Sequence, residues 1–136
     1  MRKIVILCFF AVFFAGACTT MNQHALDSGT SQVAVRNYQS RSFETTDVDN
    51  VMNNIVATMQ DLGFVIERAD RDIGTISGFS FTNQTTITVS VRLRNNSVIV
   101  RANAEKGRKA IKEPMAYQNF FNALSQSLFL TANEVL

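Results

Sequence analysis

Residues 86–105 read TITVSVRLRNNSVIVRANAE, and this stretch determines the fold class. Apolar and polar side chains alternate along it, a pattern typical of strands with one buried and one solvated face. The apolar positions that share the buried face are Ile87, Val89, Val91, Leu93, Val98, Val100, Ala102 and Ala104. Between the two runs stands Asn95-Asn96, which suits a two-residue turn because asparagine tolerates a positive φ. The stretch therefore predicts an antiparallel hairpin with one buried face.

The flanking segments predict further strands and two helices. Residues 33–44, 64–69 and 75–81 contain β-branched and aromatic residues and are predicted to be strands. In residues 47–62, and again from 114 to about 130, apolar residues recur at three- and four-residue spacing, which predicts helices with one apolar face. The predicted order is β-α-β-β-β-β-α. We expect an α+β fold in which a single antiparallel sheet of about five strands packs both helices on one face.

Side chains at the ends and on the faces of the predicted helices support this assignment. Thr46 is placed to act as the N-cap of the first helix, and Gly63 is placed to take the left-handed conformation after its last turn. The second helix carries an aromatic stripe. Within that stripe we expect Phe121 to be buried between the helix and the sheet.

The N-terminus has the parts of an export signal. Arg2 and Lys3 form a positive segment, and residues 4–14 form an unbroken apolar run. That run is too short to span a bilayer, which takes ~20 apolar residues. Residues 14–18, Phe-Ala-Gly-Ala-Cys, then resemble the lipobox of a bacterial lipoprotein, and Cys18 is the residue that would be acylated. The alternative is an ordinary secretory signal, which would leave Cys18 as a free thiol.

The lipobox resemblance implies three regions and a location. Residues 1–17 would be a signal peptide, residues 18–32 a lipidated cysteine and polar tether, and residues 33–136 a single α+β domain. Two or three acyl chains make a lasting membrane anchor, whereas one does not. Thr19 follows the cysteine, and the absence of aspartate at this position implies sorting to the outer membrane. We expect a protein anchored in the outer membrane by its lipid, with its domain facing the periplasm.

Composition excludes several classes of function. The chain has 13 basic and 11 acidic residues, and loss of Arg2 and Lys3 with the signal would balance the two signs. Bulk charge therefore indicates no nucleic-acid partner. The single histidine, His24, lies in the tether, and no nucleophile elbow, phosphate-binding loop or Cys/His metal spacing occurs. We expect no enzyme activity, no cofactor and no metal.

One dense charge cluster stands out. Lys106, Arg108, Lys109 and Lys112 lie in a segment that is predicted to be a loop, residues 106–112. Such a cluster either contacts an anionic surface, such as phosphates, lipid head groups or lipopolysaccharide, or is simply solvated. Both interpretations stay open at this point.

Four stretches resemble a family of small proteobacterial outer-membrane lipoproteins. They are residues 41–47 (RSFETTD), 62–70 (LGFVIERAD) with Gly74, 100–104 (VRANA) and 117–130 (YQNFFNALSQSLFL). The family has no assigned activity or catalytic residues, so the resemblance implies location and fold alone. The element order is also similar to the helix-grip layout of lipoprotein accessory subunits in the β-barrel assembly machinery. We expect a structural or protein-interaction module that docks on an unknown envelope protein. The alternative is a module that binds a lipid or small apolar ligand in a cavity between helices and sheet.

Replacing Cys18 tests the anchor. We expect Cys18→Ser to abolish acylation, because the sulfur that carries the lipid is lost, and to leave a precursor that is uncleaved or mis-sorted. Metabolic labelling with a fatty acid and membrane fractionation measure both effects. Label entering the variant, or wild-type protein that fractionates as freely soluble, would contradict the lipoprotein interpretation.

Overall fold

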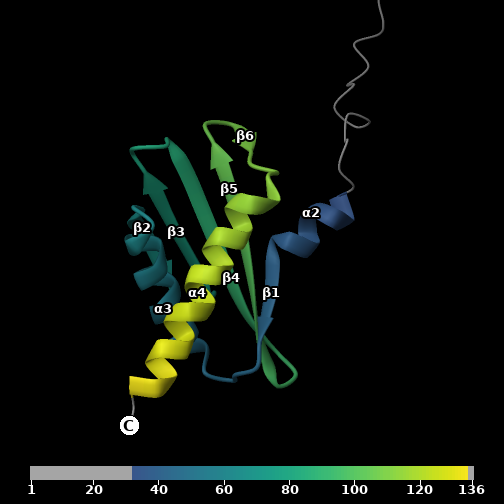
Figure 1. Ribbon diagram of the computed structural model, residues 1–136, viewed down its shortest axis with the longest axis vertical. Coiled ribbons are helices and arrows are strands. Elements are labelled where there is room, and N and C mark those ends of the chain that lie inside the picture. The colour runs from purple at the N-terminus through teal and green to yellow at the C-terminus, as the bar shows by residue number, and fades with distance from the viewer. Residues whose placement is uncertain (1–31, 135–136) are drawn as a thin grey trace, which may run out of the picture.

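The computed structural model describes residues 32–134, which form one sheet and three helices (Figure 1). The elements in chain order are α2 (Gln32–Tyr38), β1 (Ser40–Phe43), α3 (Val48–Asp61), β2 (Val65–Asp70), β3 (Thr75–Ser80), β4 (Thr85–Arg94), β5 (Ser97–Lys106), β6 (Lys109–Ala110) and α4 (Pro114–Glu134).

The sheet is antiparallel, with strand order β1-β5-β4-β3-β2 and the short β6 paired to the end of β5. Its centre is the hairpin predicted from residues 86–105. β4 and β5 pair from Thr85↔Lys106 to Arg94↔Ser97, and Asn95 takes a φ of 55° in the turn between them. The α+β class and the antiparallel sheet are confirmed. Helix α2 and strand β6 are additions to the predicted order.

Both long helices cover the same face of the sheet (Figure 1). The core lies between these two layers and draws on α3, on α4 and on the inner face of the strands. Its largest fully buried side chains include Tyr117, Phe121, Met52, Ile55 and Met59. Along β4 the buried residues alternate with partly exposed Thr86, Thr88 and Ser90, so the outer face of this strand is polar.

The prediction of a strand across residues 33–44 is wrong in its first half. Residues 32–38 form α2, and only 40–43 pair with β5. The reason is competition for the edge of β5. If β1 continued back in register, residues 36 and 37 would lie beside Glu105 and Ala104, but Ala110 pairs with Glu105 and Ile111 N–H donates to Ala104 O at 2.8 Å. Because that edge is taken, the preceding chain leaves the sheet and forms a helix.

The ends of α3 are capped by side chain and backbone. The N-cap is Asp47, not Thr46, and the Asp47 carboxylate accepts a hydrogen bond from Asn50 N–H at 2.9 Å. After the last turn Gly63 has a φ of +83°, as the sequence predicted, and Phe64 N–H donates to Met59 O at 2.9 Å. This Schellman closure reverses the chain into β2.

A polar clasp joins the two long helices. Asn54 of α3 is buried, and its side-chain oxygen accepts from Ser127 Oγ at 2.7 Å and lies 2.9 Å from Thr131 Oγ1, both on α4. The Asn54 amide donates in turn to Asn50 O at 2.8 Å. A buried amide whose donor and acceptor both have partners fixes how one helix lies against the other.

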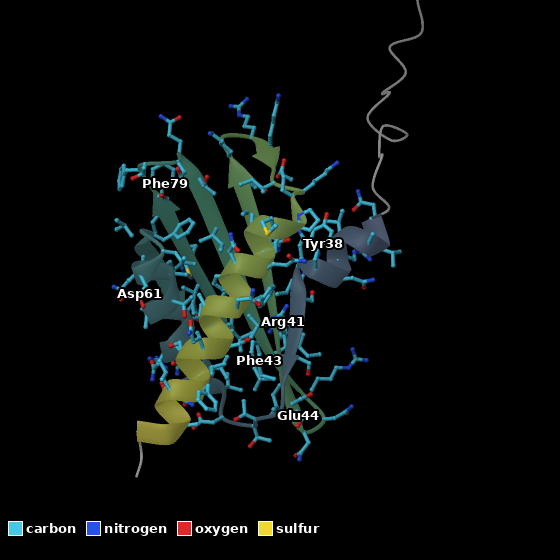
Figure 2. The ribbon with its side chains drawn as sticks, viewed as in Figure 1. Tyr38, Arg41, Phe43, Glu44, Asp61 and Phe79 are labelled. Carbon is cyan, nitrogen blue, oxygen red and sulfur yellow. The ribbon has the colours of Figure 1, made fainter. Side chains whose placement is uncertain are left out.

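Phe121 has the place that the sequence predicted for it. It is 1% exposed, lies edge-on to Phe120 with centroids 5.1 Å apart, and faces the β1 strand. Arg41 of β1 places its guanidinium 5.2 Å from the centre of the Phe121 ring. Figure 2 shows Arg41 and Phe43 on β1, on the side of α4. This ring therefore links α4 to the edge of the sheet.

We expect Phe121→Ala to lower the free energy of unfolding by ~3–5 kcal/mol, because it opens a cavity in a fully packed core. Met115→Ala is the control. Met115 also lies on α4 but is 65% exposed, so its loss should change stability by less than ~0.5 kcal/mol. Denaturant unfolding measures both variants. A loss below ~1 kcal/mol at Phe121 would mean that the ring does not carry the packing described here.

Candidate functional site

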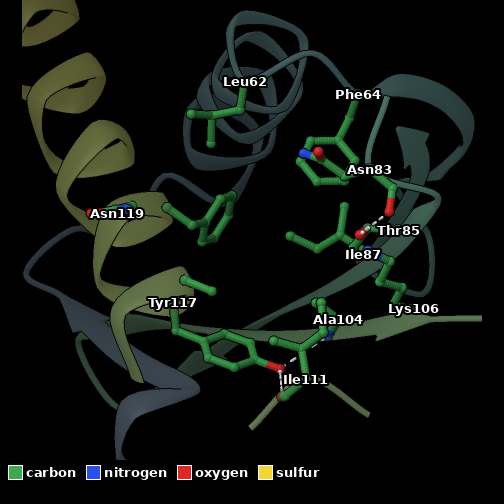
Figure 3. A pocket seen from close by; sticks show the side chains of 12 residues that line it. Leu62, Phe64, Asn83, Thr85, Ile87, Ala104, Lys106, Ile111, Tyr117 and Asn119 are labelled. Carbon is green, nitrogen blue, oxygen red and sulfur yellow. Dashed lines mark hydrogen bonds between the residues drawn. The ribbon is translucent and has the colours of Figure 1, made fainter. Parts of the chain in front are cut away.

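A cavity of about 380 Å³ lies between the helices and the sheet, where β5 turns into β6 (Figure 3). Its walls are mainly apolar, formed by Leu62, Phe64, Ile87, Ala104, Ile111 and Phe120. Asn83, Thr85, Lys106, Tyr117 and Asn119 add polar atoms. The volume lies near the lower end of the ~300–1,000 Å³ that is typical of small-molecule sites. The fold thus combines a buried core with an open, mainly apolar site at this end.

The Tyr117 hydroxyl closes one wall of this cavity. It donates to Ile111 O at 2.6 Å and accepts from Ala104 N–H at 3.1 Å and from Gln39 Nε2 at 3.2 Å. A phenol has one proton to donate and two lone pairs, so its hydrogen-bonding capacity is filled. Tyr117 is therefore a structural member of the wall and has no hydrogen bond left for a ligand.

Tyr38, the last residue of α2, joins that helix to the same end of the fold. Its hydroxyl donates to Lys112 O at 2.6 Å, and its ring centre lies 5.8 Å from that of Tyr117. Desolvation raises the pKa of the Tyr38 phenol above its usual value, and nearby Tyr117 and Glu113 add to the effect. These effects favour the protonated phenol, which is the form that donates this hydrogen bond.

The predicted loop at residues 106–112 is instead a tight hairpin. Lys106 pairs directly with Lys109, and Gly107 takes a φ of 62° in the turn. Lys106, Arg108, Lys109 and Lys112 are all exposed. Among residues 32–134, none of these four cations forms a salt bridge with a carboxylate. We call these four residues the basic hairpin.

Two of these cations lie on the cavity side. Lys106 lines the cavity itself. Side chains directly opposite each other in an antiparallel pair point to the same face, so Lys109 lies on that face too. Ile111, two residues further on, also lines the cavity, as strand alternation requires. The sequence predicted the cluster of charges but not its position beside an apolar cavity.

Cys18, the predicted acylation site, lies outside the described residues, as do the predicted signal peptide and nearly all of the tether. In the part of the chain that the structure describes, no three His, Cys, Asp or Glu side chains gather as a metal site would require. No helix within residues 32–134 is long and apolar enough to cross a membrane.

Asp70, which opens the turn between β2 and β3, has a structural role. Its carboxylate accepts from Ile73 N–H at 3.2 Å and from Arg68 Nη2 at 3.0 Å. These two bonds, the backbone bond first, hold the pKa of Asp70 below its usual value. Arg71 of the same turn reaches α3, where its Nη2 lies 2.7 Å from Asn53 Oδ1. The turn is thus explained by side-chain-to-backbone bonding and by contact with the helix.

No protein-family model matches the chain, and no curated protein matches it in sequence. The site is therefore interpreted from its own residues. The aromatic stripe predicted for the second helix includes Tyr117, but the sequence did not predict the contacts of its hydroxyl or the role of Gln39. A signal was present, because a tyrosine in a stripe of Phe and Leu must find a partner for its hydroxyl when it is buried.

Removing the Tyr117 hydroxyl tests the closed wall. Tyr117→Phe leaves Ala104 N–H, Ile111 O and the Gln39 amide without this partner, so we expect a loss of ~1–3 kcal/mol in unfolding free energy. Tyr38→Phe is the control, because its single acceptor, Lys112 O, is exposed and can bond to water, and should cost less than ~1 kcal/mol. Equal losses for the two variants in denaturant unfolding would argue against the role given to Tyr117.

Proposed function

We propose that the protein is a lipoprotein anchored in the outer membrane, and that its domain is a structural or interaction module of the cell envelope without a catalytic role. The lipobox-like residues 14–18 support the anchor. The packing of two helices against one face of an antiparallel sheet supports a helix-grip-like docking domain, with α2 and β6 as departures from that layout.

The observation that carries the proposal is the position of the basic hairpin relative to the tether. α2 is the first described element, and it spans only seven residues, or ~10 Å of helix. Its last residue, Tyr38, is hydrogen-bonded to the backbone of Lys112. The chain therefore enters the fold close to the four cations. The turn between β4 and β5 lies at the opposite end of β5. A domain tethered through residue 32 therefore carries these four cations at the tethered end.

We propose that the basic hairpin contacts an anionic surface, and that the docking face of the module includes this end. Phosphate-rich membrane surfaces attract basic segments by about 1 kcal/mol for each Lys or Arg close to them. The four side chains have no carboxylate partner within the described residues, so little has to be broken before they bind. A membrane-proximal envelope protein with an acidic face would satisfy the same charges.

A second candidate function rests on the cavity. An apolar site of about 380 Å³ beside two lysines suits a lipid or another small apolar ligand. This function is compatible with docking, because the ligand would sit between the helices and sheet while the outer surfaces stay accessible.

The test replaces Lys106, Arg108, Lys109 and Lys112 together by Gln. The midpoint of denaturant unfolding should shift only slightly, because exposed single charges contribute little to stability. The binding assay uses a lipid-free chain without residues 1–18, so that neither the predicted signal nor the acyl chains bind the vesicles. Its binding to anionic vesicles or lipopolysaccharide should fall in the four-Gln variant, and binding without these replacements should weaken with salt, given the ~8 Å screening length of physiological buffer. Recovery of partners from crosslinked envelopes should fall in parallel.

The control neutralises exposed Arg92, Arg94 and Arg101, which lie away from this end on β4 and β5. It should leave vesicle binding and partner recovery close to wild type. A wild-type chain that ignores anionic surfaces even at low salt would rule out the anionic-surface contact. Unchanged partner recovery by the four-Gln variant would show that the docking face does not include the basic hairpin.

A further inference from the structure

In the β5–β6 hairpin, the residue pair next to the turn places two like charges opposite each other. Lys106 and Lys109 are direct partners in this antiparallel pair, an arrangement that is unfavourable by itself. Neither lysine has a carboxylate partner within residues 32–134. An anion bound between them would relieve the repulsion. The two lysines therefore form a candidate binding site for an anion. This site adjoins the cavity, because Lys106 is one of the residues that line it.

The adjoining cavity, in contrast, suits an apolar group. Leu62, Phe64 and Phe120 line it together with aliphatic residues of the sheet, and its one phenol is fully hydrogen-bonded. Water in such a site would find few partners, whereas an apolar group fits it. About 380 Å³ is near the lower limit of ligand sites, so it holds one narrow chain better than the paired chains of a phospholipid.

We propose that this site binds a single-chain anionic amphiphile, a long-chain fatty acid, with its carboxylate at Lys106 and Lys109 and its chain in the cavity. This proposal deepens the second candidate function and rests on it. The acyl chains that would anchor Cys18 fit this site less well than a free fatty acid. They are linked as esters or an amide, so they have no carboxylate to place between the two lysines. Binding breaks no covalent bond.

The experiment uses the full chain in neutral phosphatidylcholine vesicles with a diazirine-bearing palmitate as probe. Irradiation followed by peptide mapping should place the crosslinks on the cavity walls, at Leu62, Phe64 or Ile111. Unlabelled palmitate should compete. Hexadecanol, which has the same chain without the carboxylate, should compete roughly three- to tenfold more weakly, the factor expected for losing contact with two partly exposed charges.

Two pairs of matched variants separate the chain site from the charge site. Ala116→Trp places a large ring at the mouth of the cavity from an exposed position on α4 and should abolish crosslinking there, whereas Ala57→Trp, exposed on α3 and away from the cavity, should not. Lys106→Gln with Lys109→Gln should weaken palmitate to the level of hexadecanol. Arg108→Gln with Lys112→Gln removes the same charge from the rest of the basic hairpin and should leave palmitate binding nearly unchanged.

The outcomes are distinct. Crosslinks spread over the exposed apolar side chains, or an unaffected Ala116→Trp variant, would overturn the site. Equal competition by palmitate and hexadecanol, with cavity crosslinks intact, would overturn the fatty acid while leaving an apolar-ligand function in place. Cavity crosslinking that appears only in the Cys18→Ser variant would show that the protein's own acyl chain occupies the site, and would likewise overturn the proposal. Partner recovery from envelopes measures the interaction module independently of all three.

Discussion

The Tyr117 hydroxyl is the interaction on which this end of the structure depends. The outer edge of β5 is covered in pieces: β1 pairs with residues 98–101, Gln39 O accepts from Ala102 N–H at 2.8 Å, and β6 pairs with Glu105 and Lys106. Between these pieces Ala104 N–H would be a buried donor without a strand partner, and the Tyr117 oxygen accepts its hydrogen bond at 3.1 Å. A buried backbone group left unpaired is costly, so one side chain of α4 completes the sheet. The same hydroxyl binds Ile111 and Gln39, which fixes the start of α4, the chain after β6 and the chain before β1 to one point.

This arrangement limits what the cavity can do. Tyr117 is the polar group that lies deepest among the buried core residues of the lining, and its donor and acceptor capacity is already used. Most of the polar side chains that remain for a ligand are exposed, namely Lys106, Asn83 and Asn119, and the buried Thr85 hydroxyl adds one acceptor. A charged group of a ligand would find its partner among the exposed residues, whereas the mainly apolar interior would select chiefly by shape and size. An apolar interior with a charged residue among its lining is the arrangement that the proposed amphiphile would require.

Sequence periodicity predicted those parts of the fold whose pairing is local. Alternation in residues 86–105 gave the central hairpin, and three- and four-residue spacing gave α3 and α4, because each pattern reports a face that the adjacent element buries. It failed for residues 33–38, where the strand-forming side chains of Val33 and Val35 compete for an edge already taken by chain more than 70 residues away. No local signal reports that competition. The cavity could not be predicted from the sequence either, because it depends on how α3, α4 and the hairpin at Lys106 meet in space.

The basic hairpin and the cavity make better sense together than apart. Four cations clustered at one end, with two of them directly paired, cost stability through mutual repulsion and gain nothing from described carboxylates. An open apolar site likewise forgoes contacts that a larger side chain at Ala104 or Ala116 would supply. Each feature lowers the stability of the free domain, and a ligand or surface with the complementary chemistry would offset this cost. They also adjoin each other, at the end where Tyr38 ties the incoming chain to Lys112. A tethered domain would hold this end at the membrane, where anionic groups and acyl chains occur side by side. Contact with both there would offset the charge repulsion and fill the apolar site together.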